Sequence, residues 1–337
     1  MPKISVLIPT FNASRYLQET LDSVLSQEGV DFEVIVLDDR STDNTADMVR
    51  ERQDPRIRLH VNEANLGTPN NVNQGLAMAS GEYIARIDHD DIALPGRLAA
   101  QARALDARPE LTVIGTQLEH FDDHVLTSNF PLNHDEITAR FIGGYAYIAN
   151  PTVMFRTEFV KKNRIFYDPN LYVVDDLGFF YDCLLKGARF ANLPDVFLKY
   201  RIHDRMTSKN LDANRLFDSK YRLYARILPR FFPNITGEEF ESIVNIYDMY
   251  SGDFPIRGGS DLDSLKKLAY AIGRAASRVD GSLGQNPQIA IDMLLGLFKS
   301  FTDFLILNLN LLTADEFNTI LAPAYYGARN QAASSVG

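Results

Sequence analysis

The sequence predicts an α/β fold in which a mostly parallel sheet is flanked by helices. Apolar runs typical of buried strands occur at 4–8 and 32–37, a third strand is expected at 57–61, and an alternating strand pattern follows at 83–87. Segments of helical spacing separate these runs. Strands that alternate with helices indicate βαβ units, because neighbouring parallel strands need a long crossover connection.

The connecting helices have identifiable ends. Ser14 can cap the first helix, whose apolar residues recur at helical spacing as far as Leu25. Ser41-Thr42-Asp43 offers caps for the second helix. Pro69 suits the first turn of the third helix, and Gly81 is expected to end it.

The later elements follow the same logic with one interruption. We expect a helix at 98–105, a strand at 113–121, a loop-rich insertion at 122–144 that lines a substrate site, a strand at 150–155, a helix from Asp175-Asp176 to Gly187, and a strand at 196–202.

Composition excludes several classes of protein. The chain has 337 residues and a net charge of −10, which argues against nucleic-acid binding and against a polybasic membrane anchor. A single cysteine, Cys183, rules out an internal disulfide framework and fits a reducing compartment. No secretory signal precedes the first strand, so we expect a cytoplasmic protein.

We expect two parts, a catalytic domain at 1–210 and a helical region at 211–337. Helical stripes at 262–272 and 291–301 suit packing on the catalytic domain or on another subunit, as in a homo-oligomer. The apolar run at 304–312 leaves open a second interpretation, peripheral docking at the inner face of a membrane.

The cluster Asp88-His89-Asp90-Asp91 stands where the fourth strand must end. Neighbouring carboxylates repel one another unless a cation or hydrogen-bond donors lie between them. From spacing alone a metal site and a solvated acidic turn remain equal alternatives.

Two further polar clusters converge on this one, since ligands of such sheets bind outside the carboxyl ends of the strands. They are residues 9–12 and Asp38-Asp39. No Gly-x-Gly-x-x-Gly or Gly-Lys-Ser/Thr loop follows the first strand, which disfavours a dehydrogenase or a Walker-type nucleotidase. A metal held by carboxylates therefore becomes the expected way to neutralise a diphosphate.

These motifs together resemble the family 2 inverting glycosyltransferases with the GT-A fold. The resemblance covers residues 3–210 and rests on motifs in order: 4–12, Asp38-Asp39-x-Ser41-Thr42-Asp43-x-Thr45, Gly81-Glu82-Tyr83-Ile84, Asp88-x-Asp90-Asp91 and Tyr200-Arg201-x-His203. The runs at 82–91 and 199–203 look most like bacterial β-1,3-N-acetylglucosaminyltransferases of lipooligosaccharide synthesis.

The resemblance implies a donor site and a metal. Asp39 would accept a hydrogen bond from the nucleotide base, Phe11 could pack on its face, and Asp88 would lie near the ribose. Asp90 would ligate Mn²⁺ or Mg²⁺. His203 would approach the metal or diphosphate, with a structural histidine as the alternative, and His89 is expected to be exposed. The implied donor-binding positions are Pro9, Thr10, Phe11, Asp39, Gly67, Asn73, Asp88 and Asp91, the last with an alternative role in orienting acceptor or sugar.

The family also uses an acidic pair at the start of a late helix, here Asp175-Asp176. The resemblance makes Asp176 the base that deprotonates the acceptor hydroxyl and Asp175 an orienting neighbour. This pair departs from the usual Glu-Asp, which leaves open which carboxylate is the base. Both residues also suit a helix N-terminus for purely electrostatic reasons.

The expected function is transfer of a sugar, with GlcNAc favoured, from a UDP-sugar to a glycan or glycolipid acceptor in surface polysaccharide synthesis, forming a β-linkage. The alternative is a non-catalytic sugar-nucleotide-binding or scaffold subunit of a polysaccharide assembly complex. The intact carboxylates Asp39, Asp88, Asp90 and Asp176 favour the enzyme.

Overall fold

The computed structural model describes residues 2–122, 125–141, 147–204 and 211–231, with 235–237, 240–241, 244 and 315. The chain divides into two compact units, Met1–Ile137 with Ala146–Leu211 and Thr138–Tyr145 with Asp212–Gly337. The helical stripes and the apolar run expected near the C-terminus lie outside the described residues. No helix within the described residues is both long and apolar enough to cross a membrane.

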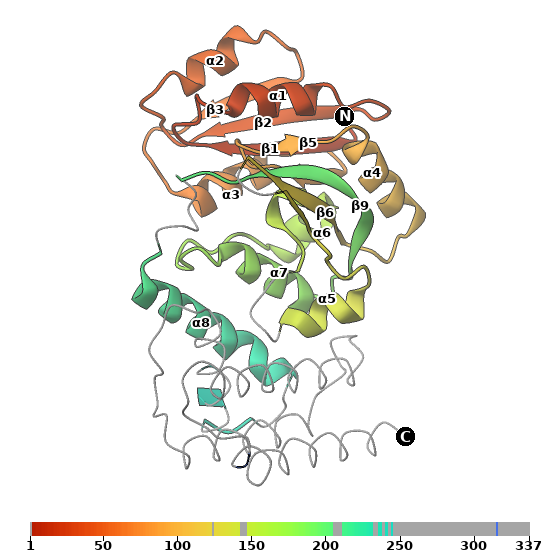
Figure 1. The fold of residues 1–337 in the computed structure, drawn as a ribbon, viewed down its shortest axis with the longest axis vertical. Helices are drawn as coiled ribbons and strands as arrows, with labels where there is room; N and C mark the ends of the chain where they lie inside the picture. Colours follow the sequence, from red (N-terminus) through yellow and green to blue (C-terminus); the bar gives the residue numbers. More distant parts are fainter. Residues whose placement is uncertain are drawn as a thin grey trace. The chain divides into compact units, whose positions relative to one another are not determined.

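The described part of the first unit is built on one mixed sheet of nine strands (Figure 1). Their order is β3-β2-β1-β4-β8-β6-β9-β5, and β7 pairs with β6. The strands are β1 (Ile4–Thr10), β2 (Phe32–Asp38), β3 (Ile57–Val61), β4 (Tyr83–Arg86), β5 (Ile92–Ala93), β6 (Val113–Phe121), β7 (Leu126–Thr127), β8 (Met154–Arg156) and β9 (Phe190–Arg201).

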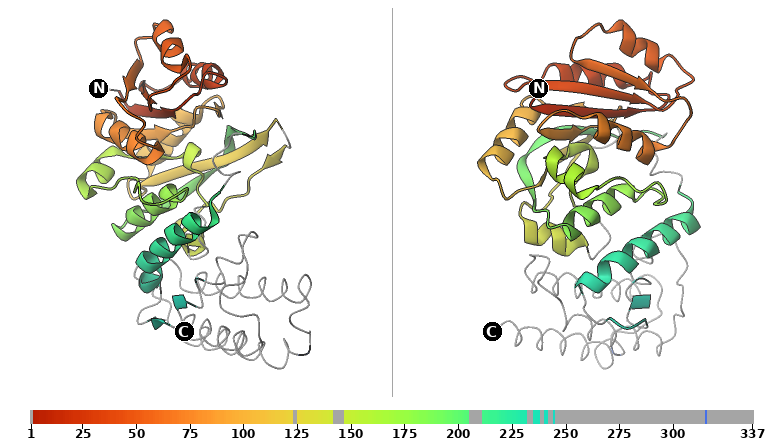
Figure 2. Two further views of the ribbon diagram at one scale, coloured as in Figure 1. Left: turned by 90° about the vertical axis from the view of Figure 1, so that its left-hand side faces the viewer. Right: turned by 180° about the vertical axis from the view of Figure 1, so that it is seen from behind.

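Helices cover both faces of the sheet. The described helices that begin in the first unit are α1 (Leu17–Leu25), α2 (Thr45–Glu51), α3 (Thr68–Met78), α4 (Arg97–Ala107), α5 (His134–Phe141), α6 (Thr157–Asn163) and α7 (Asp175–Leu185). Helix α8 (Ala213–Phe231) belongs to the second unit, which is described by itself. Helices α1 and α2 lie on one face of β1–β3 and α3 on the other (Figure 2). Alternate residues of a strand point to opposite faces of a sheet. Because helices cover both faces here, every residue of β1 and β2 is buried.

The first four strands of the order are parallel, which brings their carboxyl ends together. Thr10 pairs with Asp38, and Leu7 pairs with Arg86 at the end of β4. The polar residues that follow β1, β2 and β4 therefore emerge at one edge of the sheet. This is the edge at which ligands of open α/β sheets bind.

The predicted α/β class is confirmed, with local corrections. The sheet is more mixed than expected, because β8 runs antiparallel to both β4 and β6. The predicted strand at 150–155 begins as a short 3₁₀ turn around Pro151, since proline cannot donate to the ladder. The last strand starts at Phe190, six residues early, where Pro194 and Asp195 obscure the pattern.

Three smaller predictions were wrong. The insertion expected at 122–144 contains β7 and α5, and none of its described residues lines the cavity at the carboxyl edge of the sheet, where we expected it to line a substrate site. Ser14 does not cap α1: its amide donates to Asp43, and the capping position is Tyr16. Helix α3 ends at Met78, before Gly81.

Gly81 has a different role, a close approach to β1. A Cβ at this position would lie 2.6 Å from the amide nitrogen of Ser5 and 2.7 Å from the carbonyl carbon of Ile4. Both atoms belong to a buried strand and cannot move aside. We therefore expect Gly81→Ala to lower the free energy of unfolding by about 1–3 kcal/mol, the usual cost of overpacking.

Urea unfolding would measure this difference. Gly237→Ala is the matched control, because a Cβ there meets no atom within 4 Å. Equal stability of Gly81→Ala and wild type would show that the two backbones are not in close contact.

Candidate active site

A cavity of about 870 Å³ opens at the carboxyl edge of the sheet. Residues from the ends of β1, β2 and β4, from the start of α7 and from the last part of β9 line it. The predicted site residues that line it are Pro9, Thr10, Phe11, Asp39, Asp88, Asp90, Asp175, Asp176 and His203. Segments far apart in the sequence are thus brought to one pocket.

One end of the pocket is formed by the loop after β1. Phe11 is 46% exposed, so its ring offers an apolar face to the pocket rather than to the core. Asn12 adopts a φ of 50°, and its side-chain oxygen accepts from the amide of Thr42 at 2.8 Å. Asparagine tolerates the left-handed conformation better than most residues do. This contact fixes the loop that carries Phe11.

Asp39 lines the same end and is almost fully buried. Its carboxylate accepts hydrogen bonds from Asn62 Nδ2, Leu66 N and Gly67 N, each at 2.8 Å. Three of about four acceptor positions of the carboxylate are therefore occupied by the protein. Asp39 holds the loop between β3 and α3 and has one acceptor position left for a ligand.

Gly67 and Asn73 do not line the pocket. Gly67 has a φ of 79°, a conformation that suits glycine, and it donates to Asp39. Asn73 holds the backbone of Tyr167, accepting from its amide at 2.8 Å and donating to its carbonyl at 2.7 Å. The structure places both residues behind the lining, where they support residues of the site.

The Asp88–Asp91 turn separates its carboxylates. Asp88 accepts from Arg86 Nη2 at 3.1 Å, and Asp90 Oδ2 lies 2.8 Å from His203 Nε2. His89, expected to be exposed, is half-buried, with its Nδ1 3.3 Å from the carbonyl oxygen of Pro9. The hydroxyl of Thr20 on α1 donates to the carbonyls of His89 and Asp91 at 2.8 Å, which holds the turn on that helix, and His89 also lines the pocket.

Asp91 points away from the pocket. It is 1% exposed and accepts from the amide of Arg201 at 3.0 Å, while its Oδ2 has no hydrogen-bond partner. Burial, with the nearby charges of Asp88 and Asp90, raises the pKa of Asp91 well above its usual value. The structure therefore does not bring Asp91 to the donor-binding residues of the pocket lining.

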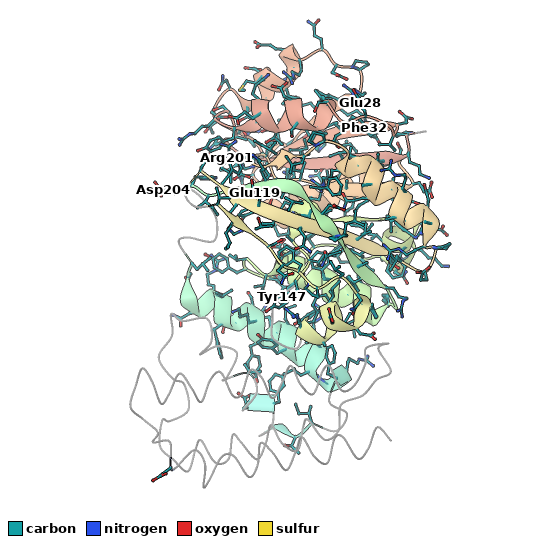
Figure 3. The ribbon with its side chains drawn as sticks, turned by 45° about the vertical axis from the view of Figure 1, so that its right-hand side comes forward. Glu28, Phe32, Glu119, Tyr147, Arg201 and Asp204 are labelled. Carbon is teal, nitrogen blue, oxygen red and sulfur yellow. The ribbon has the colours of Figure 1, made fainter. Side chains whose placement is uncertain are left out.

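Arg201 holds this turn in place and was not predicted as a site residue. Figure 3 shows it at the end of β9, and its guanidinium is packed between the rings of Tyr16 and Phe121, 4.4 and 4.5 Å from their centroids. It donates to Glu19 at 2.8 Å, Asp122 at 2.7 Å and the carbonyl of Asp90 at 2.8 Å. The sequence signal was its place in Tyr200-Arg201-x-His203.

The metal-binding capacity of the site rests on Asp90 and His203. The described residues contain no group of three or more His, Cys, Asp or Glu side chains arranged around a common point. A carboxylate and an imidazole in direct contact, facing a pocket, still fit a divalent cation that takes its other ligands from a diphosphate and water.

Asp175 and Asp176 line the same pocket from the first turn of α7. Burial and the adjacent Asp176 carboxylate raise the pKa of Asp175 to about 7, although Arg86 opposes this. Burial also raises the pKa of Asp176, whose Oδ1 accepts from the amide of Leu177 at 2.6 Å. A carboxylate with a pKa near neutrality is suited to general base catalysis.

The fold and the site together define a class. A mixed α/β sheet carries an exposed aromatic face and a buried aspartate at one end of its pocket, an Asp-x-Asp turn in the middle and an acidic pair opposite. This is the arrangement of the GT-A glycosyltransferases.

The comparisons with known proteins identify the family. The model of glycosyl transferase family 2 matches residues 5–164. A glycosyltransferase of Haemophilus influenzae is 30% identical over 220 residues, covering 61% of this chain and 68% of the relative. One from Methanocaldococcus jannaschii is 31% identical over 212 residues, covering 60% and 72%. The chain belongs to glycosyl transferase family 2 and is a glycosyltransferase.

A solved structure supports the fold. TarS 1–349 of S. aureus in complex with UDP-GlcNAc superposes with a TM-score of 0.62 and 21% identity, covering 89% of this chain and 92% of that one. In sequence, the Staphylococcus aureus poly(ribitol-phosphate) beta-N-acetylglucosaminyltransferase TarS is 30% identical over 209 residues, which is 59% of this chain and 35% of TarS.

The raised pKa of Asp175 predicts a pH-dependent stability. The folded protein keeps a proton that the unfolded chain releases above 3.8, so this stabilisation is complete at low pH and lost as the pH rises through about 7. Asp175→Asn mimics the protonated form. We expect its stability relative to wild type to rise by about 2 kcal/mol between pH 5 and pH 8.

Urea unfolding at the two pH values checks this expectation. Asp182→Asn, on the same helix but outside the pocket lining, serves as the control. A difference between Asp175→Asn and wild type that stays constant with pH would contradict it.

Proposed function

We propose that this glycosyltransferase is an inverting, metal-dependent enzyme that moves a sugar, GlcNAc in preference, from a UDP-sugar to a glycan or glycolipid acceptor of surface polysaccharide synthesis, forming a β-linkage. The observation that carries this proposal is the single pocket that gathers Phe11 and Asp39, Asp90 and His203, and the Asp175-Asp176 pair. The catalytic domain is residues 1–210, acting at the cytoplasmic face of a membrane.

The donor end is supported by two features of the pocket. The exposed face of Phe11 suits stacking by a planar base, and Asp39 retains one acceptor position for a base N–H. UDP-GlcNAc is the ligand of the TarS complex whose fold matches this chain. Asp88, held by Arg86, is the residue that we assign to the ribose.

The metal would be held by Asp90 and His203, with Mn²⁺ favoured over Mg²⁺ because imidazole is a poor ligand for magnesium. When bound, it supplies positive charge that balances the diphosphate leaving group. The chain itself holds both ligands in place, since Arg201 fixes the carbonyl of Asp90 and Tyr16 packs 5.2 Å from the ring of His203.

Asp176 is the residue that we assign as the base, with Asp175 orienting the acceptor. Asp176 accepts the proton of the acceptor hydroxyl as that oxygen attacks the anomeric carbon, and the proton stays on the carboxyl group until product leaves. Attack on the face opposite the diphosphate turns an α-linked donor into a β-linked product. His120 on β6 and Tyr200 on β9 also line the pocket, and their ring centroids lie 5.4 Å apart.

Loss of the base should abolish transfer and preserve donor binding. We expect Asp176→Asn to lower kcat by about 10²-fold or more while the Kd for UDP changes little, because an amide cannot accept the proton. UDP release with Mn²⁺ and a candidate acceptor measures the first quantity, and calorimetry measures the second.

Asp182→Asn on the same helix is the control and should keep wild-type turnover. If Asp176→Asn transferred sugar at the wild-type rate, the catalytic base would be reassigned to Asp175. A wild type that releases UDP from no UDP-sugar would overturn the proposed donor class.

The donor preference can be tested without an acceptor. A ligand that binds the folded state stabilises it by about 2.7 kcal/mol at a hundredfold excess over Kd. We expect UDP-GlcNAc to raise the melting temperature more than UDP-GalNAc, UDP-Gal or UDP-Glc when Mn²⁺ is present. Asp90→Ala should lose the part of this increase that depends on Mn²⁺, and a larger shift with another donor would correct the sugar.

A further inference from the structure

Arg86 is an arginine of the pocket lining that the proposed reaction does not use. It is the last residue of β4, and its backbone is fixed on both sides. Its amide donates to the carbonyl of Val153 at 3.0 Å, and its carbonyl accepts from Arg97 Nη2 at 2.7 Å. The side chain is 5% exposed, so its charge is held inside the protein at the wall of the pocket.

The guanidinium makes few direct bonds for a buried arginine. Nη2 donates to Asp88 at 3.1 Å, whereas Nε and Nη1 are buried and have no hydrogen-bond partner among the described residues. A buried charge that is not satisfied by direct bonds must be balanced by the field of nearby opposite charges. The carboxylates that interact with it in this way are Asp88 and Asp175, which line the same pocket.

A column of rings connects Arg86 to the helix that carries the acidic pair. Its Cζ lies 5.2 Å from the centroid of the Tyr167 ring, which stacks on Phe179 of α7 at 4.5 Å and 11°. Phe179 follows Asp175-Asp176 by one helical turn. Since Asn73 fixes the backbone of Tyr167 through two hydrogen bonds, the column is rigid at its centre.

The groups that face the acidic pair come from several elements. They are Arg86 on β4, Asp88 in the loop after it, Tyr167 before α7 and Tyr200 on β9. Asp88 disfavours the charged form of the pair, whereas Arg86 favours it and lowers the pKa of both Asp175 and Asp176. Arg86 therefore opposes the effects of burial and of the neighbouring carboxylate.

We propose that Arg86 is a positioning residue of the reaction: its buried guanidinium supplies positive charge to the pocket that Asp175-Asp176 also lines, and its stack on Tyr167 fixes the helix that presents the pair. The inference rests on the proposed function, because it assigns a purpose to the base of that reaction. It also links the two halves of the site, since the same guanidinium holds Asp88 on the donor side.

The test begins with a measurement that needs no turnover. Protein labelled with ¹³C at its aspartate carboxyls is titrated by NMR, and Asp175→Asn and Asp176→Asn assign the signals of the pair. We expect Arg86→Gln to raise the pKa of the pair by about 1–3 units, the usual effect of losing an adjacent opposite charge. Arg86→Lys, which keeps the charge, should stay closer to wild type.

Arg56→Gln is the matched control. Arg56 also pairs with a carboxylate, Asp54, at 2.8 Å and packs on a ring, Phe32, at 4.9 Å, but it does not line the pocket. Its loss should leave the titration of Asp175-Asp176 unchanged.

The second measurement is the pH profile of kcat for sugar transfer. The acidic limb of Arg86→Gln should move to higher pH by the same amount, with kcat recovering toward wild type at alkaline pH. A uniform loss of kcat at every pH, or a carboxyl titration that does not move, would overturn the proposal, because it would leave Arg86 only a packing role.

Two further arms keep the test decisive. If Arg86→Gln does not fold, Arg86→Gln/Asp88→Asn removes both members of the ion pair and is compared with Asp88→Asn alone in the NMR titration. If wild type transfers from no UDP-sugar, the proposed function fails, while the NMR titration still supports or overturns the effect of Arg86 on the pair.

Discussion

The structure depends on how it manages repulsion between carboxylates. Asp88, Asp90, Asp175 and Asp176 line one pocket, and Asp91 lies directly behind it. Burial, and after it the charges of neighbouring carboxylates, raises the pKa values of Asp91, Asp175 and Asp176. A fold that gathers them must supply positive charge, from its own arginines or from a ligand.

The parallel arrangement of β1, β2 and β4 is what gathers these carboxylates at one pocket. Because the carboxyl ends of these strands meet at one edge, the polar residues after each strand converge without any long-range loop. The antiparallel β8 lies between β4 and β6, and the chain then leads to α7, whose first turn faces the same cavity. The topology therefore brings the residues after β1, β2 and β4 and the first turn of α7 to one pocket.

The sequence predicted the elements that depend on local pattern. Continuous apolar runs predicted the buried strands. The motifs that resemble the family predicted six site residues, all of which line the pocket: Asp39, Asp88, Asp90, Asp175, Asp176 and His203. The roles of these residues stay predictions. The pattern could not show in which direction each side chain points. Nothing in the sequence distinguishes Asp91, which points inward, from Asp90, whose Oδ2 lies 2.8 Å from His203 Nε2. Asn73 likewise turned out to hold the backbone of Tyr167, a contact across 94 positions of sequence.

Two buried arginines, both missed as site residues, illustrate opposite ways to use a charge. The guanidinium of Arg201 contacts two carboxylates, a carbonyl and two rings. These direct contacts neutralise its charge and hold the Asp90 turn. Arg86 makes one ion pair, and its Nε and Nη1 have no hydrogen-bond partner among the described residues, so direct bonds neutralise less of its charge. A buried cation with many direct bonds holds the groups that it binds, whereas one with few is balanced mainly by charges farther away. Under the proposal above, Arg86 is therefore the residue that connects Asp88 with the Asp175-Asp176 pair.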